Sequence, residues 1–353
     1  MNWVHHAVRQ IESDFNRSAD THLIKLPFCG TDTVQVFLKD ESSHPSGSLK
    51  HRLARSLFLY ALCNGWIQEG TPIVEASSGS TAISEAYFAR LLGLPYHTVI
   101  PAQTSKRKIK EIEFLGGKCH LVESSQIYTR ASELTQELGG CYLDQFTYAE
   151  RATDWRGNNN IAESLFRQLE MEPNPIPTWV VVGAGTGGTS ATIGRYIRYF
   201  SLDTKLCVAD PENSVYAEYF RCRDSKLTCP RPSRIEGIGR PRVEPSFIPS
   251  VIDRVIEVPD SASIACMQFL EQFIGRRCGP STGTNLWAVF QLVSEMKARG
   301  ERGNVVSLIC DGGERYLETH YCDSWLASQQ LDPTPYRQAI EQFQATGELS
   351  VDA

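Results

Sequence analysis

Short apolar runs alternate with longer amphipathic stretches along most of the chain. Runs of the length of a buried strand lie at residues 72–76, 96–101, 118–122, 179–182, 205–209 and 304–310. Apolar positions recur at helical spacing at residues 81–92, 105–115, 129–138 and 189–199. Strand, loop and helix in repeated succession predict an α/β fold, with parallel sheets and helices on both faces. A polar stretch, residues 151–160, interrupts this alternation of predicted strands and helices, which continues after it.

A lysine opens one of the predicted helices. The strand that contains Val36 to Leu38 leads into a Pro/Ser/Gly loop, and this loop ends on Lys50 just before a helical stretch at residues 52–62. The positive end of a helix dipole disfavours an ammonium group there. A neutral amine is what a Schiff-base lysine requires. Most loop lysines are simply solvated, so this interpretation depends on the loops that follow.

A glycine-rich loop follows the valine-rich strand at 179–182. Residues 183–189 read Gly-Ala-Gly-Thr-Gly-Gly-Thr and lead into a helix. Successive backbone N–H groups in such a loop can bind one anion, and the helix dipole adds a favourable potential. Gly183 to Gly188 also fits the dinucleotide fingerprint, with Asp210 near the expected ribose-binding acid. A phosphate cradle and an NAD-dependent oxidoreductase therefore both remain open at this point.

Two further loops carry small polar residues ahead of a helix. Residues 75–81 read Glu-Ala-Ser-Ser-Gly-Ser-Thr, which offers more hydroxyl groups than a helix cap needs. Hydroxyls and N–H groups at a helix N-terminus suit an amino-acid carboxylate. Residues 279–285 read Gly-Pro-Ser-Thr-Gly-Thr-Asn and precede a helix that we expect to begin near Leu286.

The amino-acid composition limits the classes of function that this chain can have. The chain has 353 residues, 41% hydrophobic and 22% charged, which is ordinary for an enzyme with two lobes. A net charge of -6 gives no indication of nucleic acid or an anionic membrane as partner. The sequence shows neither a membrane-length apolar run nor a signal-peptide pattern, so we expect a cytoplasmic protein. The eleven cysteines are scattered without paired spacing, which indicates reduced thiols and no metal site.

The lysine loop, the two polar loops and the glycine loop stand in the order found in fold-type II pyridoxal phosphate enzymes. The chain resembles this group over about residues 23–317. The group includes O-acetylserine sulfhydrylase, cystathionine beta-synthase and the tryptophan synthase beta subunit. Within it, the chain is most similar to bacterial cysteine synthase-like proteins described as cysteine desulfhydrases.

The resemblance implies a role for each matching position. Lys50 would carry pyridoxal 5'-phosphate as a Schiff base, and Ser281 would face the pyridine nitrogen. The cofactor-binding residues would be Lys50, Ser80, Gly185, Thr186, Gly187, Gly188, Thr189 and Ser281. The substrate-binding residues would be Ser77, Ser78, Gly79, Thr81, Gln145, Gly237 and Arg240.

The implied reaction is beta-elimination on L-cysteine, giving hydrogen sulfide, pyruvate and ammonia. A beta-replacement synthase that makes cysteine from O-acetylserine and sulfide is the alternative within the family, and a non-catalytic sensor that keeps the fold is another. Three positions depart from the sulfhydrylase pattern and argue against strict synthase activity: His44, Ser80 and Arg240. Arg240 would influence substrate choice, or it would be a surface arginine paired with an acid such as Glu236.

The resemblance also implies the architecture. A large cofactor-binding lobe would comprise residues 1–51 and 151–330, and a small mobile lobe that closes over the substrate would comprise residues 52–150, with the cofactor between them. Residues 331–353 would form a helical tail, in which Tyr336, Ile340 and Phe343 lie at helical spacing. The small-molecule substrate would be an amino acid, and a homodimer is expected.

Overall fold

The chain divides into two compact units in the computed structural model, which describes residues 2–17, 20–27 and 33–351. The first unit comprises Met1–Asp20 and His44–Asp154, and the second comprises Thr21–Ser43 and Trp155–Ala353. These bounds differ from the expected lobes, because residues 1–20 and 44–51 belong to the first unit. The reason is an N-terminal helix that the sequence analysis did not identify. Its residues Ala7 and Ile11 are buried in the core of the first unit.

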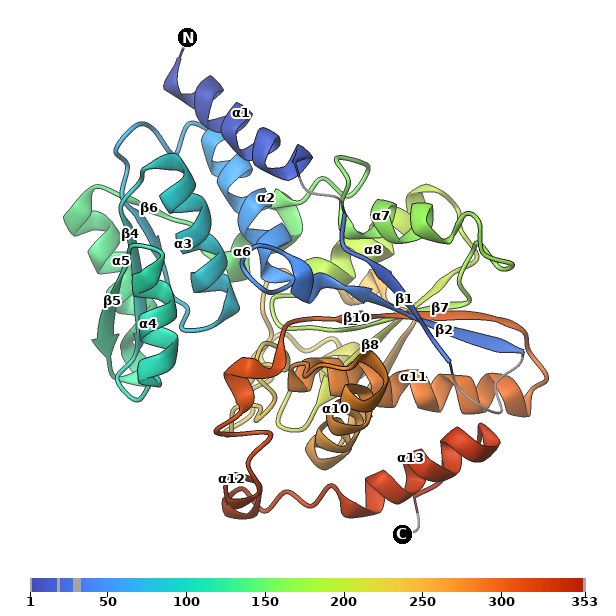
Figure 1. The fold of residues 1–353 in the computed structure, drawn as a ribbon. Helices are drawn as coiled ribbons and strands as arrows, with labels where there is room; N and C mark the ends of the chain where they lie inside the picture. The colour runs from blue at the N-terminus through green and yellow to red at the C-terminus, as the bar shows by residue number, and fades with distance from the viewer. Residues whose placement is uncertain (1, 18–19, 28–32, 352–353) are drawn as a thin grey trace. The chain divides into compact units, whose positions relative to one another are not determined.

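The first unit is built on a parallel sheet of four strands, in the order β5-β4-β3-β6, within the described residues (Figure 1). The strands are β3 (Ile73–Glu75), β4 (Tyr96–Pro101), β5 (Gly117–Val122) and β6 (Cys141–Tyr142). The helices are α1 (Trp3–Asn16), α2 (Lys50–Cys63), α3 (Ser80–Leu92), α4 (Lys106–Phe114), α5 (Ile127–Leu138) and α6 (Gln145–Ala152). The predicted strand at 96–101 is confirmed to the residue.

Successive strand residues of the first unit face opposite sides of its sheet. Ile73 and Tyr96 are buried in a cluster with apolar residues of α2 and α3. Val74 and Val99 are buried in a second cluster with residues of α5. A short parallel strand with both faces buried reads as a continuous apolar run, which explains the sequence of β3.

The second unit contains a six-stranded sheet in the described residues, in the order β1-β2-β10-β7-β8-β9. Its strands are β1 (Leu23–Leu26), β2 (Val34–Asp40), β7 (Trp179–Gly183), β8 (Lys205–Pro211), β9 (Arg254–Val258) and β10 (Gly303–Ile309). Its helices are α7 (Ile161–Leu169), α8 (Gly188–Tyr199), α9 (Tyr216–Cys222), α10 (Asp260–Ile274), α11 (Pro280–Ala298), α12 (Asp323–Ser328) and α13 (Thr334–Thr346). Among the strand pairings of this sheet that the structure describes, that of β1 with β2 is antiparallel and the others are parallel.

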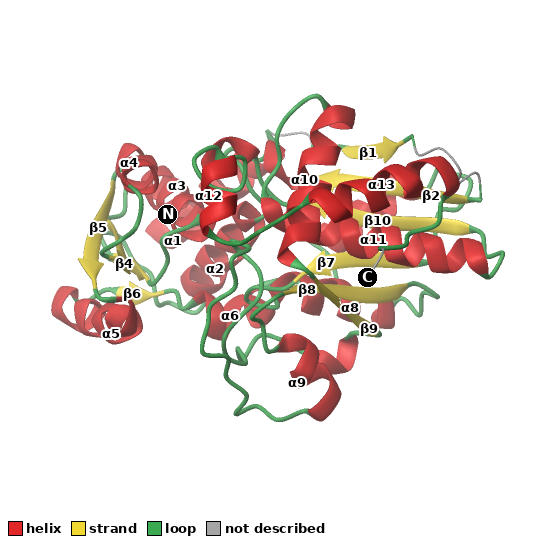
Figure 2. Cartoon of the chain, turned by 90° about the horizontal axis from the view of Figure 1, so that it is seen from below, coloured by secondary structure: helices red, strands yellow, loops and turns green. Residues whose placement is uncertain are grey.

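Helices cover both faces of the larger sheet. Helices α7 and α8 lie on one face, and α10 and α11 lie on the other (Figures 1 and 2). The tail helix α13 packs against α10, and its Ile340 and Phe343 are buried in the core of the second unit. Residues 352 and 353 of the expected tail lie outside the described residues.

Helix α11 begins at Pro280, six residues before the start near Leu286 that we expected from the sequence. Proline suits the first position of a helix because its fixed φ is already helical and its missing N–H would have no partner there. Ser281 therefore lies within the first turn of α11 and not in a loop ahead of the helix.

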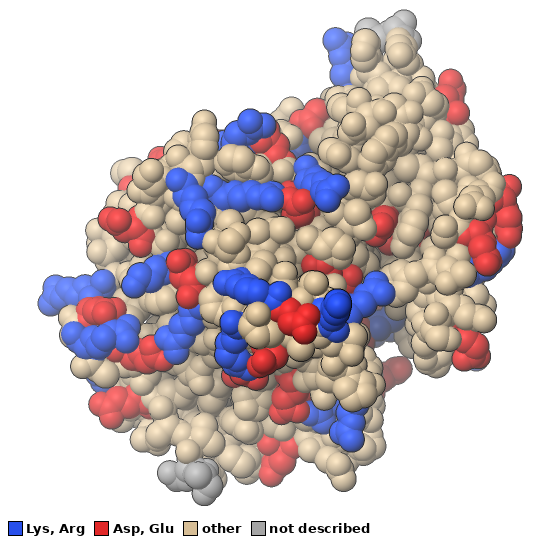
Figure 3. Space-filling model, turned by 180° about the vertical axis from the view of Figure 1, so that it is seen from behind, with Lys and Arg blue, Asp and Glu red and all other residues tan. Residues whose placement is uncertain are grey.

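Surface features agree with the composition. On the face shown in Figure 3, basic and acidic side chains are interspersed. Every cysteine that the structure describes is a free thiol. Among the described helices, none combines the length and the hydropathy needed to cross a bilayer.

Candidate active site

Lys50 is the first residue of α2 and is half-buried in the first unit. The loop ahead of it is held by Ser46, whose Oγ lies 2.8 Å from Ser84 Oγ of α3 and 3.1 Å from His51 Nδ1. All three of these side chains are buried. The ring of His51 stacks on His44, with centroids 4.9 Å apart. The loop that ends at the lysine is thus tied to α3, which a solvated surface loop would not require.

The polar loop at residues 75–81 connects β3 to α3. Its residues Ser77 to Gly79 are half-buried, and Ser80 begins the helix. The Thr81 hydroxyl donates to Gln145 Oε1 at 2.7 Å, and both residues are buried. The structure therefore brings together two of the predicted substrate-binding residues that are 64 positions apart. Half-buried hydroxyls and N–H groups at the start of α3 suit a carboxylate ligand.

The glycine loop of the second unit connects β7 to α8. Gly187 has φ +90° and precedes the first residue of α8, Gly188. A Cβ at Gly187 would lie 2.5 Å from Phe247 Cα, and a Cβ at Gly185 would clash with the carbonyl oxygen of Gly237. The close packing of Gly237 and Phe247 leaves no room for a side chain at Gly185 or Gly187, so the backbone of the loop is uncovered at these two positions. This cradle, at a helix N-terminus, fits the phosphate of a cofactor.

Ser281 is buried in the first turn of α11. One turn further on, Asn285 is fully buried, and its Oδ1 has no hydrogen-bond partner among the described residues. A buried polar atom without a partner costs free energy unless a ligand or water completes it. A hydroxyl group and an amide oxygen along one helix fit the polar atoms of a cofactor ring.

Arg240 is held by an acid within its own unit. Its guanidinium forms an ion pair with Glu244 at 2.7 Å, and Glu244 is buried. The backbone N–H of Arg240 also donates to Ser214 Oγ at 3.1 Å. The sequence analysis offered pairing with an acid, such as Glu236, as the alternative to a role in substrate choice, and the structure shows that Glu244 is an acid partner of the guanidinium. The pair holds the segment next to Gly237 in place.

Asp210 ends up in the interior of the second unit. Its side chain is 1% exposed, and Oδ2 accepts the N–H of Ala217 at 2.8 Å. Burial raises the pKa of Asp210 to about 7. A carboxyl group enclosed in this way does not bind the ribose of a dinucleotide. The oxidoreductase interpretation therefore lacks a ribose-binding acid at Asp210.

The raised pKa of Asp210 predicts a pH-dependent stability. Its folded pKa, about 7, lies above the unfolded value of 3.8, so the native state binds more protons between these pH values. Stability should therefore fall as pH rises through this window. We expect Asp210→Asn to reduce the fall in melting temperature between pH 5 and pH 8 by about 3 °C or more. The control is Asp253→Asn, because the exposed Asp253 also accepts a backbone N–H, from Leu206 at 2.7 Å. Equal pH slopes for Asp210→Asn and the wild type would contradict the prediction.

Two contacts at these loops were not found from the sequence. The Tyr216 hydroxyl donates to the carbonyl of Gly185 at 2.6 Å, and its ring stacks on Phe247 with centroids 3.9 Å apart. Tyr216 begins α9, in a segment that the sequence shows only as rich in Pro, Arg and Ser. Since such contacts cross 31 positions, no local pattern marks them.

The α/β architecture, the lysine at a helix start, the hydroxyl-rich loop and the glycine cradle are features that the resemblance to pyridoxal phosphate enzymes predicts. A sequence model described as "Pyridoxal-phosphate dependent enzyme" matches residues 16–311. The chain belongs to this family, and its cofactor is pyridoxal 5'-phosphate.

Individual relatives support the same placement. The chain is 58% identical to L-cysteine desulfhydrase Cds1 of Mycobacterium tuberculosis, over 97% of this chain and 95% of that protein. It is 29% identical to a cysteine synthase of Aquifex aeolicus, over 82% of this chain and 84% of that protein. The crystal structure of O-ureido-L-serine synthase superposes with a TM-score of 0.76 at 24% identity, covering 91% of this chain and 98% of the other, and shows the shared fold.

Proposed function

We propose that this enzyme is a carbon–sulfur lyase that converts L-cysteine and water to hydrogen sulfide, pyruvate and ammonia. The observation that carries the proposal is the 58% identity to an L-cysteine desulfhydrase over nearly the whole length of both chains. Cysteine synthases are more distant relatives, at 29% identity for the Aquifex aeolicus protein. The alternative, beta-replacement, would use the same residues with a thiol nucleophile in place of water.

Each predicted residue has a role in this proposal. Lys50 would supply the amine that holds the cofactor, and the same amine, once released, would remove the α-proton of the substrate as a general base. The cofactor, when bound, withdraws the electron pair that this leaves at the α-carbon. Ser281 offers the ring nitrogen a neutral hydroxyl group, and Ser80 offers a hydrogen bond at the start of α3. Gly185, Thr186, Gly187, Gly188 and Thr189 bind the phosphate.

The substrate carboxylate binds, in this proposal, to the loop that precedes α3. Ser77, Ser78 and Gly79 supply hydroxyl and N–H groups, and Thr81 acts together with Gln145, its hydrogen-bond partner. Gly237 is a further substrate-binding residue in this proposal, and Arg240 affects substrate choice through the segment that its ion pair with Glu244 fixes. The bounds of the mobile lobe at 52–150, a homodimer and a cytoplasmic location complete the proposal, on the ground of the family resemblance.

The proposed reaction is tested by a product assay. We expect purified protein with pyridoxal phosphate to release sulfide and pyruvate from L-cysteine in equal amounts. Synthesis of L-cysteine from O-acetylserine and sulfide should be at least about tenfold slower, a difference that needs only about 1.4 kcal/mol in activation free energy. Faster synthesis than elimination would favour the synthase. Binding of NAD by a colourless protein would support the oxidoreductase.

A further inference from the structure

Two carboxyl groups lie inside the first unit, next to the loop assigned to the substrate carboxylate. Glu75 is the last residue of β3, and Glu85 lies in the second turn of α3. Both side chains are 0% exposed. Burial of an acidic side chain is costly and is seldom found without compensating hydrogen bonds. The pair therefore calls for an explanation that packing alone does not give.

The carboxylate of Glu75 joins two separate segments. Oε1 accepts the N–H of Ala76 at 2.9 Å, and Oε2 accepts the N–H of Gln145 at 3.3 Å. The side chain of Gln145 accepts the Thr81 hydroxyl at 2.7 Å. The bonds form a closed circuit that runs from Glu75 along the loop to Thr81, across to Gln145, and back to Glu75. Both ends of the loop are thus fastened to the start of α6.

A second strand fixes the middle of the same loop. The hydroxyl of Thr98, on β4, donates to the carbonyl of Ser77 at 2.5 Å. Thr98 is paired with Glu75 in the register of β3 and β4. The loop is therefore hydrogen-bonded to the sheet as well as to α6. We expect a substitution at Glu75 to alter the position of the loop directly.

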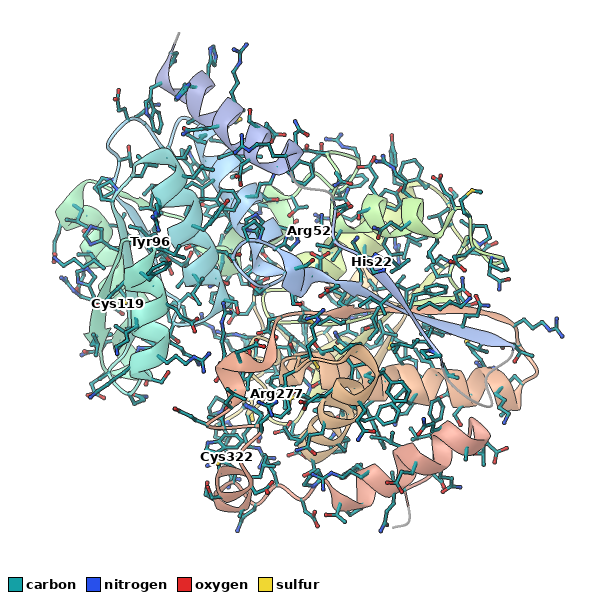
Figure 4. The ribbon with its side chains drawn as sticks, in the orientation of Figure 1. His22, Arg52, Tyr96, Cys119, Arg277 and Cys322 are labelled. Atoms are coloured by element: carbon teal, nitrogen blue, oxygen red, sulfur yellow. The ribbon has the colours of Figure 1, made fainter. Side chains whose placement is uncertain are left out.

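Glu85 supplies the neutral partner of the pair. Its Oε2 accepts the hydroxyl of Tyr96, labelled in Figure 4, at 3.0 Å, and its carboxyl group also shares a side-chain hydrogen bond with Glu75. Burial raises the pKa of both glutamates, and repulsion from Glu75 raises the pKa of Glu85 further. Two adjacent buried carboxyl groups cannot both be charged at low cost, so one keeps its proton. Burial raises the pKa of Glu75 to about 7, but its two N–H donors favour the charged form, so the pair holds its proton on Glu85 in preference to Glu75.

We propose that Glu75, supported by Glu85, is a positioning residue that holds residues 76–81 and Gln145 ready for the substrate carboxylate. The proposal rests on the proposed function, because it takes this loop as the carboxylate pocket. A preformed pocket avoids the cost of ordering the loop when the substrate binds. Loosening the pocket should therefore weaken binding of amino acids and leave amines without a carboxylate unaffected.

The test compares binding with turnover in the holoenzyme. Glu75→Gln keeps one oxygen but turns an N–H₂ group toward a backbone N–H donor. We expect it to raise the Kd of L-alanine, followed by the cofactor absorbance, and the KM of L-cysteine by about tenfold or more, with kcat within about threefold. The Kd of cysteamine, which lacks the carboxylate, should stay within about twofold. L-Alanine has no leaving group, so its Kd tests the pocket even if L-cysteine is not a substrate.

Further variants separate positioning from general damage. The matched control is Asp260→Asn, because Asp260 is fully buried in the second unit and also accepts a backbone N–H, from Glu212 at 3.2 Å. It should leave the Kd of L-alanine within about twofold. Glu85→Gln keeps a donor toward Glu75 and an acceptor for Tyr96, so its effect on Kd should be at most a third of that of Glu85→Leu.

Two results would overturn the proposal. One is an unchanged Kd of L-alanine in Glu75→Gln, and the other is an equal loss of affinity for L-alanine and cysteamine. If Glu75→Gln does not fold, Glu75→Asp decides. Its shorter carboxylate cannot reach both N–H groups and should raise the Kd of L-alanine, and not that of cysteamine. Absence of sulfide release, with the expected change in L-alanine binding, would reject the lyase reaction and keep the positioning role.

Discussion

Replacing Lys50 by alanine is expected to lower the rate of sulfide release from L-cysteine by at least about a thousandfold. The amine at the start of α2 is assigned both the covalent hold on the cofactor and the removal of the α-proton. Neither role can be taken over by a methyl group. The variant protein should also lose the visible absorbance band that the wild type loses on reduction with borohydride.

The control for this change is another lysine that is also the first residue of a helix. Lys106 is the first residue of α4, in the same unit, and is exposed. Lys106→Ala should keep both the absorbance band and the activity. Retention of the band and of sulfide release by Lys50→Ala would contradict the assignment of Lys50, and with it the proposed mechanism.

Replacing Gly185 by alanine is expected to weaken binding of pyridoxal phosphate by about a hundredfold or more. The added Cβ would clash with the carbonyl oxygen of Gly237, which is backbone and cannot rotate away. Either the loop or the segment at Gly237 must move, and the backbone N–H groups then no longer converge on the phosphate. Each misdirected hydrogen bond to a charged group costs about 1.5–3 kcal/mol, so two suffice for this effect. The Kd follows from titration of the apoprotein with the cofactor.

Gly157→Ala is the matched control for the glycine loop. A Cβ at Gly157 would meet no atom within 4 Å, and this glycine belongs to the same unit. Its cofactor affinity and melting temperature should be close to those of the wild type. If Gly185→Ala bound pyridoxal phosphate as tightly as Gly157→Ala, the phosphate would have to bind elsewhere.

Most strands of both sheets could be predicted because their sequence patterns are local, whereas β1, β6 and β9 were not identified. A buried strand such as β4 is an apolar run bounded by polar residues, and α3 repeats apolar positions at helical spacing. Helices α7, α9, α10 and α12 have no counterpart among the predicted elements, and three further helices were missed, recognised only in part or misplaced. Helix α1 was not identified, α6 was seen only as the motif around Gln145, and α11 begins earlier than expected. Their starts depend on caps and on burial against other elements, which periodicity alone does not reveal.

The residues that touch the cofactor could be proposed from motifs, whereas the residues that hold them in place could not. The Thr81–Gln145 bond, the Tyr216–Gly185 bond and the buried Glu75–Glu85 pair each join positions from different elements. In the sequence, Glu75 is one more polar residue at the end of a strand. Its charge becomes informative only when its exposed fraction, 0%, is known.

By itself, the sequence determined the alternation of strands and helices, the family, and the loops that carry a lysine, hydroxyl groups and glycines. These features follow from periodicity and from short motifs, because backbone geometry acts over only a few neighbouring residues. The tertiary structure alone decided that Asp210 is enclosed, that Arg240 pairs with Glu244, and that Glu75 fastens the loop to Gln145. Burial and partnership depend on sheet order and register, which bring distant segments together and remove them from water.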